Sequence, residues 1–359
     1  MTATGSEAVQ VQTVLGPIGL ADLGVTMMHE HTVSDLSEAG HTGVRPFSVA
    51  LSSQKVSAAN AWMLREDPYS NPDNCCLDDE DITVAELGLL VEAGGQTLVD
   101  NSTGRGRHPD ALVRLAQRTG LNVVMASGWS LAHGSDDSWG DADPQAFADQ
   151  LVAEHRDGVC LADGQRIFPG VIGEIGVGPN FTRSEWMTLH AAALAQPRTG
   201  VPLLIHLPGW QRRAHEVLDI VFGHGIDPGS VVLAHMDPSG KDTVYQREIA
   251  SRGVWLEFDM IGMPNNFPGE GQSPSVQDTV DAVSGLIADG LFDQLLLSQD
   301  MFLKNMWTRY GGNGYGFVLS AFLPRLFEAG VPEELTRALM TSNPAQVFAN
   351  AARSGRPTA

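Results

Sequence analysis

Leu23-Gly24-Val25-Thr26-Met27-Met28-His29-Glu30-His31 is an apolar run that ends in two histidines flanking a glutamate. In an extended strand alternate side chains share a face, so His29 and His31 point to one side and Glu30 to the other. Two imidazoles on one face can bind the same metal ion. A single pair of this kind is more often structural than metal-binding, so its meaning depends on the strands that follow.

Apolar segments of strand length recur after this run and alternate with segments of helical spacing from residue 81 onward. Besides residues 23–28, the expected strands cover residues 97–100, 123–126, 168–175, 202–206, 230–235, 253–258 and 294–298. The expected helices cover residues 82–93, 110–118, 144–155, 184–196, 211–222, 243–251, 276–288 and 317–329. This alternation predicts an α/β fold, a closed (β/α)8 TIM barrel. An open doubly wound sheet is the alternative, but no Gly-x-Gly-x-x-Gly turn follows an early strand.

The 359 residues, 43% of them hydrophobic, are expected to form a single barrel domain over residues 1–359, with the barrel at about 23–330. Residues 9–14 alternate apolar and polar before the turn residues of Gly16-Pro17 and Gly19, which predicts a short N-terminal hairpin. Residues 36–81 are irregular and rich in proline, which indicates an inserted loop region. Residues 331–359 are expected to contain two C-terminal helices, over 332–340 and 344–352.

The charge balance excludes some classes of partner. Acidic residues outnumber basic ones 43 to 22, for a net charge of −21, so the long-range field repels nucleic acid and anionic membranes. No segment has the pattern of a secretory signal or the length of a membrane span. The adjacent Cys75 and Cys76 and the isolated Cys160 suit no disulfide framework, which indicates a reducing cytoplasm.

Four more candidate metal ligands, Glu174, His206, His235 and Asp300, stand at the expected carboxyl ends of later strands. TIM barrels place their active sites at that end. Four imidazoles and two carboxylates exceed what one zinc ion needs, so we expect two divalent ions, Zn²⁺ first, with Mn²⁺, Co²⁺ and Fe²⁺ as alternatives. Glu174 is the natural bridge, because a carboxylate can give one oxygen to each ion. Glu257 and Asp259, at the end of the seventh strand, receive no role.

The motifs His29-x-His31, Ile172-Gly173-Glu174-Ile175, Leu204-Ile205-His206, Leu233-Ala234-His235 and Ser298-Gln299-Asp300 resemble those of the phosphotriesterase family of the amidohydrolase superfamily. Glutamate at the bridging position, where the founding members carry a carboxylated lysine, is similar to the phosphotriesterase-related branch. The resemblance implies a binuclear zinc-type centre. His29, His31 and Asp300 would bind the more buried metal, His206 and His235 the other, with Glu174 between them.

The expected reaction is hydrolysis of a carboxyl ester, lactone or amide of a small molecule by a hydroxide that bridges the two metals. Asp300 would also be catalytic, as the group that passes a proton to the leaving group. Phosphoester or phosphotriester hydrolysis is the alternative. A TatD-type nuclease and a non-catalytic binding barrel are weaker rivals, since the charge opposes the first and the complete ligand set opposes the second. We expect a homodimer that acts without a nucleic-acid or membrane partner.

Candidate substrate contacts lie in loops that follow the strands, on the rim where a barrel binds its substrate. They are Arg105, Arg107, Trp129, Lys304, Tyr310 and Tyr315. An arginine or lysine at this rim could bind a carboxylate or sulfonate of the substrate.

Overall fold

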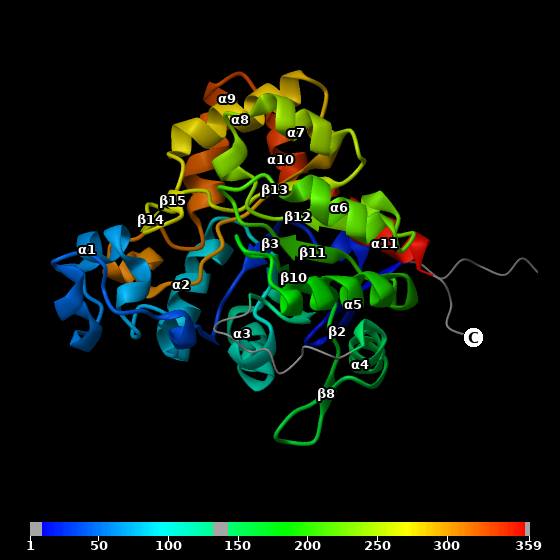
Figure 1. Ribbon diagram of the computed structural model, residues 1–359, viewed down its shortest axis with the longest axis horizontal. Helices are drawn as coiled ribbons and strands as arrows, with labels where there is room; N and C mark the ends of the chain where they lie inside the picture. The colour runs from blue at the N-terminus through cyan, green and yellow to red at the C-terminus, as the bar shows by residue number, and fades with distance from the viewer. Residues whose placement is uncertain (1–8, 132–142, 356–359) are drawn as a thin grey trace, which may run out of the picture.

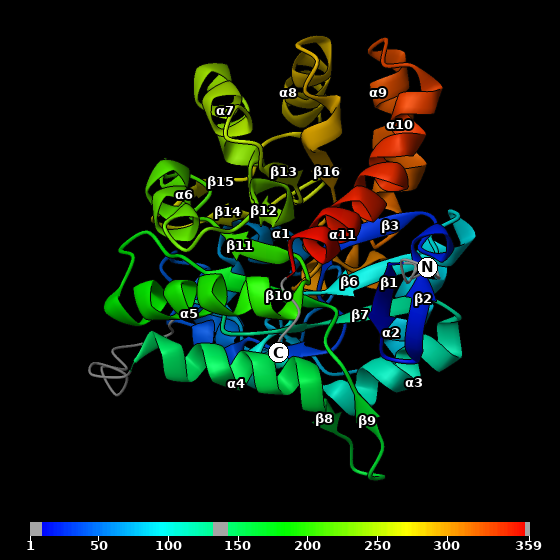
Figure 2. The same cartoon turned by 90° about the vertical axis from the view of Figure 1, so that its right-hand side faces the viewer.

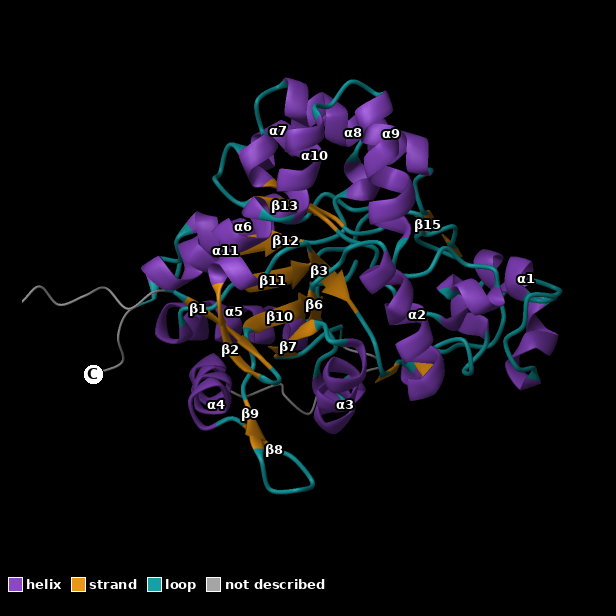
Figure 3. Cartoon of the chain, turned by 180° about the vertical axis from the view of Figure 1, so that it is seen from behind, coloured by secondary structure: helices purple, strands orange, loops and turns teal. Residues whose placement is uncertain are grey.

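A closed parallel barrel forms the centre of the computed structural model, which describes residues 9–131 and 143–355. Its strands follow one another around the sheet in chain order (Figure 3). They are β3 (Thr26–Glu30), β6 (Thr97–Asp100), β7 (Asn122–Ser127), β10 (Val171–Gly176), β11 (Leu203–His206), β12 (Val231–Leu233), β13 (Trp255–Phe258) and β16 (Leu295–Leu297). The last strand meets the first through the Ser298 hydroxyl, which accepts the His29 N–H, and the Asp300 N–H, which donates to the His29 carbonyl. The predicted (β/α)8 barrel is confirmed.

Helices surround the strands (Figure 1). They are α2 (Glu80–Glu92), α3 (Pro109–Thr119), α4 (Pro144–Asp157), α5 (Arg183–Thr199), α6 (Ala214–Phe222), α7 (Thr243–Ala250), α8 (Val276–Ala288), α9 (Leu323–Glu328), α10 (Glu333–Met340) and α11 (Ser342–Ser354). The prediction of a single α-helix over residues 317–329 is wrong. A π-helical turn, Val318–Phe322, precedes the shorter helix α9. Pro324 has no N–H to donate into the preceding turn, which disfavours a continuous α-helix. In the described residues no helix is long and apolar enough to cross a membrane.

Two apolar layers hold the barrel together. Alternate strand residues such as Val99, Val124 and Leu204 fill its interior, as the two-residue period of a strand requires. The amino-terminal end of this interior is covered by the predicted hairpin, β1 (Gln10–Thr13) with β2 (Gly16–Gly19), and by α11 (Figure 2). The other strand residues pack outward against the helices. The carboxyl end is therefore the end left open for a site.

Residues between β4 (Ser34–Asp35) and β5 (Cys76–Leu77), which we call the inserted segment, cover part of the carboxyl end of the barrel. The two short strands pair antiparallel and bring the ends of the segment together. The segment contains one short helix, α1 (Ala61–Glu66), and several 3₁₀ turns, and it packs beside the hairpin of β14 (Asn266–Phe267) and β15 (Gly271–Gln272) (Figure 1). A further hairpin, β8 (Val159–Cys160) with β9 (Arg166–Ile167), extends from the helical layer.

Candidate metal centre

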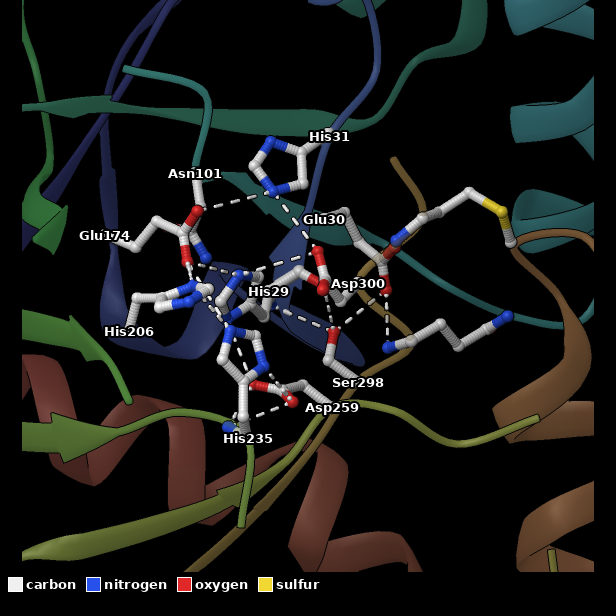
Figure 4. Close-up of polar contacts among 12 residues, drawn as sticks. His29, Glu30, His31, Asn101, Glu174, His206, His235, Asp259, Ser298 and Asp300 are labelled. Atoms are coloured by element: carbon white, nitrogen blue, oxygen red, sulfur yellow. Dashed lines mark hydrogen bonds and ion pairs between the residues drawn. The ribbon is translucent and has the colours of Figure 1, made fainter. Parts of the chain in front are cut away.

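The structure brings all six predicted ligands together at the carboxyl end of the barrel (Figure 4). His29 and Glu174 lie within β3 and β10, His206 ends β11, and His31 directly follows β3. His235 and Asp300 stand a short distance after the ends of β12 and β16. The backbone turns sharply at two of these positions, where φ is 59° for His235 and 49° for Asp300. Side chains other than glycine rarely adopt this left-handed region, and such residues cluster at functional sites.

Glu174 lies between two groups of donor atoms. On one side, Asp300 Oδ1 is 3.2 Å from His31 Nε2 and 3.8 Å from His29 Nε2. On the other side, Glu174 Oε2 is 2.9 Å from His206 Nδ1, and His206 Nδ1 is 2.8 Å from His235 Nε2. Glu174 Oε2 also lies 3.4 Å from His29 Nε2. These distances place one carboxylate against both groups, which is the arrangement that a bridging ligand requires.

The unpartnered nitrogen of His29 shows that this donor set fits metal ions. Nε2 of His29 is fully buried and has no hydrogen-bond partner among the described residues, although the side chain has carboxylates on both sides. A buried polar atom without a partner is costly, and a metal ion is the partner that a ring of imidazoles and carboxylates favours. His29 with His31 and Asp300, and His29 with Glu174 and His235, each gather their donor atoms closely enough to hold one ion.

Asp259 and Glu257 orient two of the ligand histidines. Asp259 lies 2.8 Å from His235 Nδ1 and 3.1 Å from His29 Nδ1, and Glu257 lies 3.3 Å from the same His29 nitrogen. Burial alone would raise the pKa of Asp259, but His235 and His29 hold it well below its usual range. A charged acceptor at Nδ1 favours the tautomer that leaves Nε2 free for a metal. Sequence reasoning assigned no role to these two carboxylates, although their position at the end of the seventh strand was a usable signal.

Glu30 fixes the loop that carries Asp300. Its carboxylate accepts the backbone N–H groups of Gln299 and Met301, each at 3.0 Å, and lies 2.8 Å from Ser298 Oγ. Burial raises the pKa of Glu30 to about 8, although these hydrogen bonds oppose the shift. Gln299 and Met301 flank Asp300, so the middle residue of the first motif holds the backbone of the last one.

Three of the predicted substrate contacts, Lys304, Tyr310 and Tyr315, interact with other residues of the chain. Lys304 is buried and paired with Asp73 at 3.0 Å and Asp78 at 2.6 Å. The Tyr310 ring stacks on Trp307. Tyr315 is fully buried, and its hydroxyl donates to the His31 carbonyl at 2.6 Å, so it supports a ligand instead of contacting the substrate.

The other three predicted contacts follow strands β6 and β7. Arg107 pairs with Glu154 and donates to the Ala126 carbonyl, which ties α4 to the barrel. Trp129 packs edge-on against Phe147, 5.2 Å between ring centroids. The backbone of Arg105 lies in a 3₁₀ turn, Gly104–Gly106, and its side chain falls outside the part of the chain that the structure describes.

A cavity of about 70 Å³ opens beside the ligands. Its lining includes four of them, namely His31, Glu174, His206 and Asp300. The apolar part of the lining includes Phe302 and, from the inserted segment, Leu36, Ala39 and Tyr69. Sequence reasoning did not identify Tyr69 or Phe302, because neither stands at a regular distance from a strand end. Five of the six predicted substrate contacts are absent from the described lining of this cavity: Arg107, Trp129, Lys304, Tyr310 and Tyr315.

Comparison with known proteins agrees with this geometry. The model of the phosphotriesterase family matches residues 9–348. The chain belongs to the phosphotriesterase family. An N-acetyltaurine hydrolase of Danio rerio is 34% identical over 341 residues, which cover 93% of this chain and 96% of the relative. A phosphotriesterase-related protein of Nematostella vectensis is 31% identical with the same two coverages. The crystal structure of a resiniferatoxin-binding protein from Rhodobacter sphaeroides has a TM-score of 0.89 at 43% identity, covering 94% of each chain.

Family membership confirms the resemblance seen in the sequence motifs and the prediction of an enzyme. The protein is a metal-dependent hydrolase of small molecules. Neither the phosphoester alternative nor the nuclease alternative is favoured by these relatives.

Proposed function

We propose that the protein hydrolyses the amide bond of a small N-acyl compound at a centre of two divalent ions, with Zn²⁺ as the native metal and Mn²⁺, Co²⁺ or Fe²⁺ as substitutes. The observation that carries this proposal is the gathering of six donor side chains at one end of the barrel, where the buried Nε2 of His29 has no hydrogen-bond partner among the described residues. Relatives that share nearly the whole chain and are named N-acetyltaurine hydrolases favour an amide over an ester or a lactone.

Six side chains would hold the ions: His29, His31 and Asp300 in one group, His206 and His235 in the other, and Glu174 shared between them. When bound, two divalent ions polarise a scissile carbonyl and acidify water. Asp259 and Glu257 keep Nε2 of His29 and of His235 directed at the ligand ring through the contacts at Nδ1.

Asp300 is the proposed proton acceptor. Its carboxylate faces His31 and His29, and Glu30 holds the backbone on both sides of it. It takes a proton from the attacking water and delivers it to the leaving amine, which must be protonated to depart. Leu36, Ala39 and Tyr69 of the inserted segment line the same cavity as Asp300.

We also propose that the enzyme is a cytoplasmic homodimer. The three free cysteines and the strongly acidic composition support the cytoplasm. Light scattering of the purified chain tests the dimer, and cell fractionation tests the compartment.

The function is tested with protein stripped of metal and reconstituted with zinc. Mass spectrometry measures the ions per chain, and amine release is followed for N-acetyltaurine and N-acetyl amino acids beside an aryl ester, a lactone and a phosphotriester. Two ions per chain and fastest turnover of an amide are expected. A preference for the lactone, the ester or the phosphotriester, or binding of only one ion, would show the proposal to be wrong.

A further inference from the structure

The inserted segment places one tyrosine in the cavity of the metal centre. Tyr69 lies in a 3₁₀ turn, Pro68–Ser70, and lines the cavity with His31, Glu174 and Asp300. Its backbone is fixed because the Tyr69 carbonyl accepts the His41 N–H at 3.0 Å and the Pro68 carbonyl accepts the Asn74 side-chain amide at 2.9 Å. Hydrogen bonds therefore fix the position of Tyr69, although this residue lies in an irregular part of the chain.

Tyr69 belongs to a cluster of three rings that we call the aromatic wall: Tyr69, Phe267 and Phe302. The Tyr69 centroid is 5.7 Å from that of Phe267 and 6.3 Å from that of Phe302, and the two phenylalanines stack at 6.5 Å. The rings come from the inserted segment, the β14–β15 hairpin and the loop after β16. Contacts at these distances fix the rings relative to one another, so the wall is formed before a substrate arrives.

The Tyr69 hydroxyl distinguishes this ring from a packing residue. No described residue forms a hydrogen bond with it, although the side chain lies in the same cavity as two ligand carboxylates. Burial raises the pKa of the phenol well above its ordinary value, and nearby carboxylates, among them Glu270 and Asp300, add to the shift. A phenol has an ordinary pKa of about 10, so its hydroxyl is protonated at neutral pH and can donate a hydrogen bond. The Tyr69 side chain is only partly buried, so the hydroxyl is accessible to a molecule in the cavity.

We propose that Tyr69 contacts the substrate, its hydroxyl donating a hydrogen bond to a substrate oxygen and its ring packing with Phe302 against an apolar acyl group. This inference rests on the proposed function for the kind of bond that is cleaved. It adds the substrate class, an amide or ester whose acyl part is a short hydrocarbon chain. Leu36 and Ala39 add further apolar surface to the lining of this cavity, and Phe302 packs edge-on against the ligand His31.

The test compares Tyr69→Phe, which removes only the hydroxyl, with Tyr69→Ala, which also removes the ring. Tyr245→Phe is the matched control, because the Tyr245 hydroxyl accepts the Ala214 N–H in the outer helical layer. The substrates are p-nitrophenyl acetate, propionate and butyrate. Metal content and thermal unfolding of each variant show whether it is folded and loaded.

In the wild type we expect kcat/KM to rise about fourfold per added methylene, the factor that burial of one methylene provides. Tyr69→Phe should lower kcat/KM about tenfold for all three esters, the loss expected for one hydrogen bond, and Tyr69→Ala should abolish the dependence on chain length. Tyr245→Phe should change neither. Equal rates for wild type and Tyr69→Phe, or no dependence on chain length in the wild type, would overturn the proposal.

A binding measurement separates this inference from the proposed function. Acetate, propionate and butyrate are titrated into the zinc-loaded wild type and Tyr69 variants by calorimetry, without turnover. Tighter binding of longer carboxylates that depends on Tyr69 supports the aromatic wall even if no amide is hydrolysed. The opposite result is rapid amide hydrolysis together with carboxylate affinities that depend on neither chain length nor Tyr69. That result would contradict this inference but not the proposed function.

Discussion

The six ligands and the inserted segment meet at one cavity, but they are held in different ways. The ligands stand on barrel strands or within a few residues of a strand end, and buried carboxylates such as Asp259 and Glu30 hold them from behind. The inserted segment is irregular and partly solvent-exposed, and ring contacts and ion pairs such as Lys304–Asp73 tie it to the barrel. A rigid scaffold thus positions the ligand side chains, while a loop forms the surface that a substrate meets.

Removal of the metals should have the largest effect and should act on the ligand side of the cavity. Dialysis against a chelator is expected to abolish hydrolysis and to lower the thermal unfolding temperature, because the buried Nε2 of His29 and its neighbours lose their partners. Zinc should restore both. Activity that survives with less than one ion per chain would contradict the metal-dependent role of the six ligands.

Asp300→Asn should come next, with a loss of turnover of about 10²–10⁴-fold. The amide keeps an oxygen for the metal but cannot accept the proton, so the bound metal should change little. Steady-state kinetics and metal analysis measure the two effects on the same sample. Unchanged turnover would limit Asp300 to metal binding.

Glu30→Ala should lower turnover or metal affinity about 10–100-fold, since it releases the backbone on both sides of Asp300. Glu86→Ala is the matched control, because buried Glu86 holds the Thr308 and Arg309 N–H groups in the same way, away from the ligands. Both variants should lose about 1–3 kcal/mol of stability in urea unfolding. Equal activity of the two variants would show that Glu30 acts only on folding.

Lys304→Met should have the smallest effect on catalysis. It tests how the inserted segment is held to the barrel. The Lys304 side chain is 7% exposed and its ammonium group pairs with Asp73 and Asp78, so its loss should lower stability by about 1–3 kcal/mol with kcat/KM unchanged. Lys55→Met is the control, because Lys55 pairs with the same Asp73 oxygen while 85% exposed, where an ion pair contributes little. A large rise in KM for Lys304→Met would restore its predicted role as a substrate contact.

Features that repeat with the barrel were predictable. Period-two strands, helical spacing and the position of His206, His235 and Asp300 at strand ends each follow from local rules, so the barrel and the meeting of the six ligands could be expected. The rim could not be predicted in the same way. Lys304, Tyr310 and Tyr315 follow a strand as a substrate contact should, yet their side chains pack elsewhere.

The sequence by itself determined the barrel, the six candidate ligands and the family, because strand and helix periods and ligand spacing are properties of the chain alone. Only the tertiary structure decided which groups orient those ligands and which groups line the cavity beside them. Asp259 contacts His235 and His29, and Glu30 on the first strand accepts hydrogen bonds from the loop after the last strand. Tyr69, from the inserted segment, lines the cavity beside the ligands. These contacts join residues far apart in sequence, so they depend on how strands and loops meet, which no local pattern records.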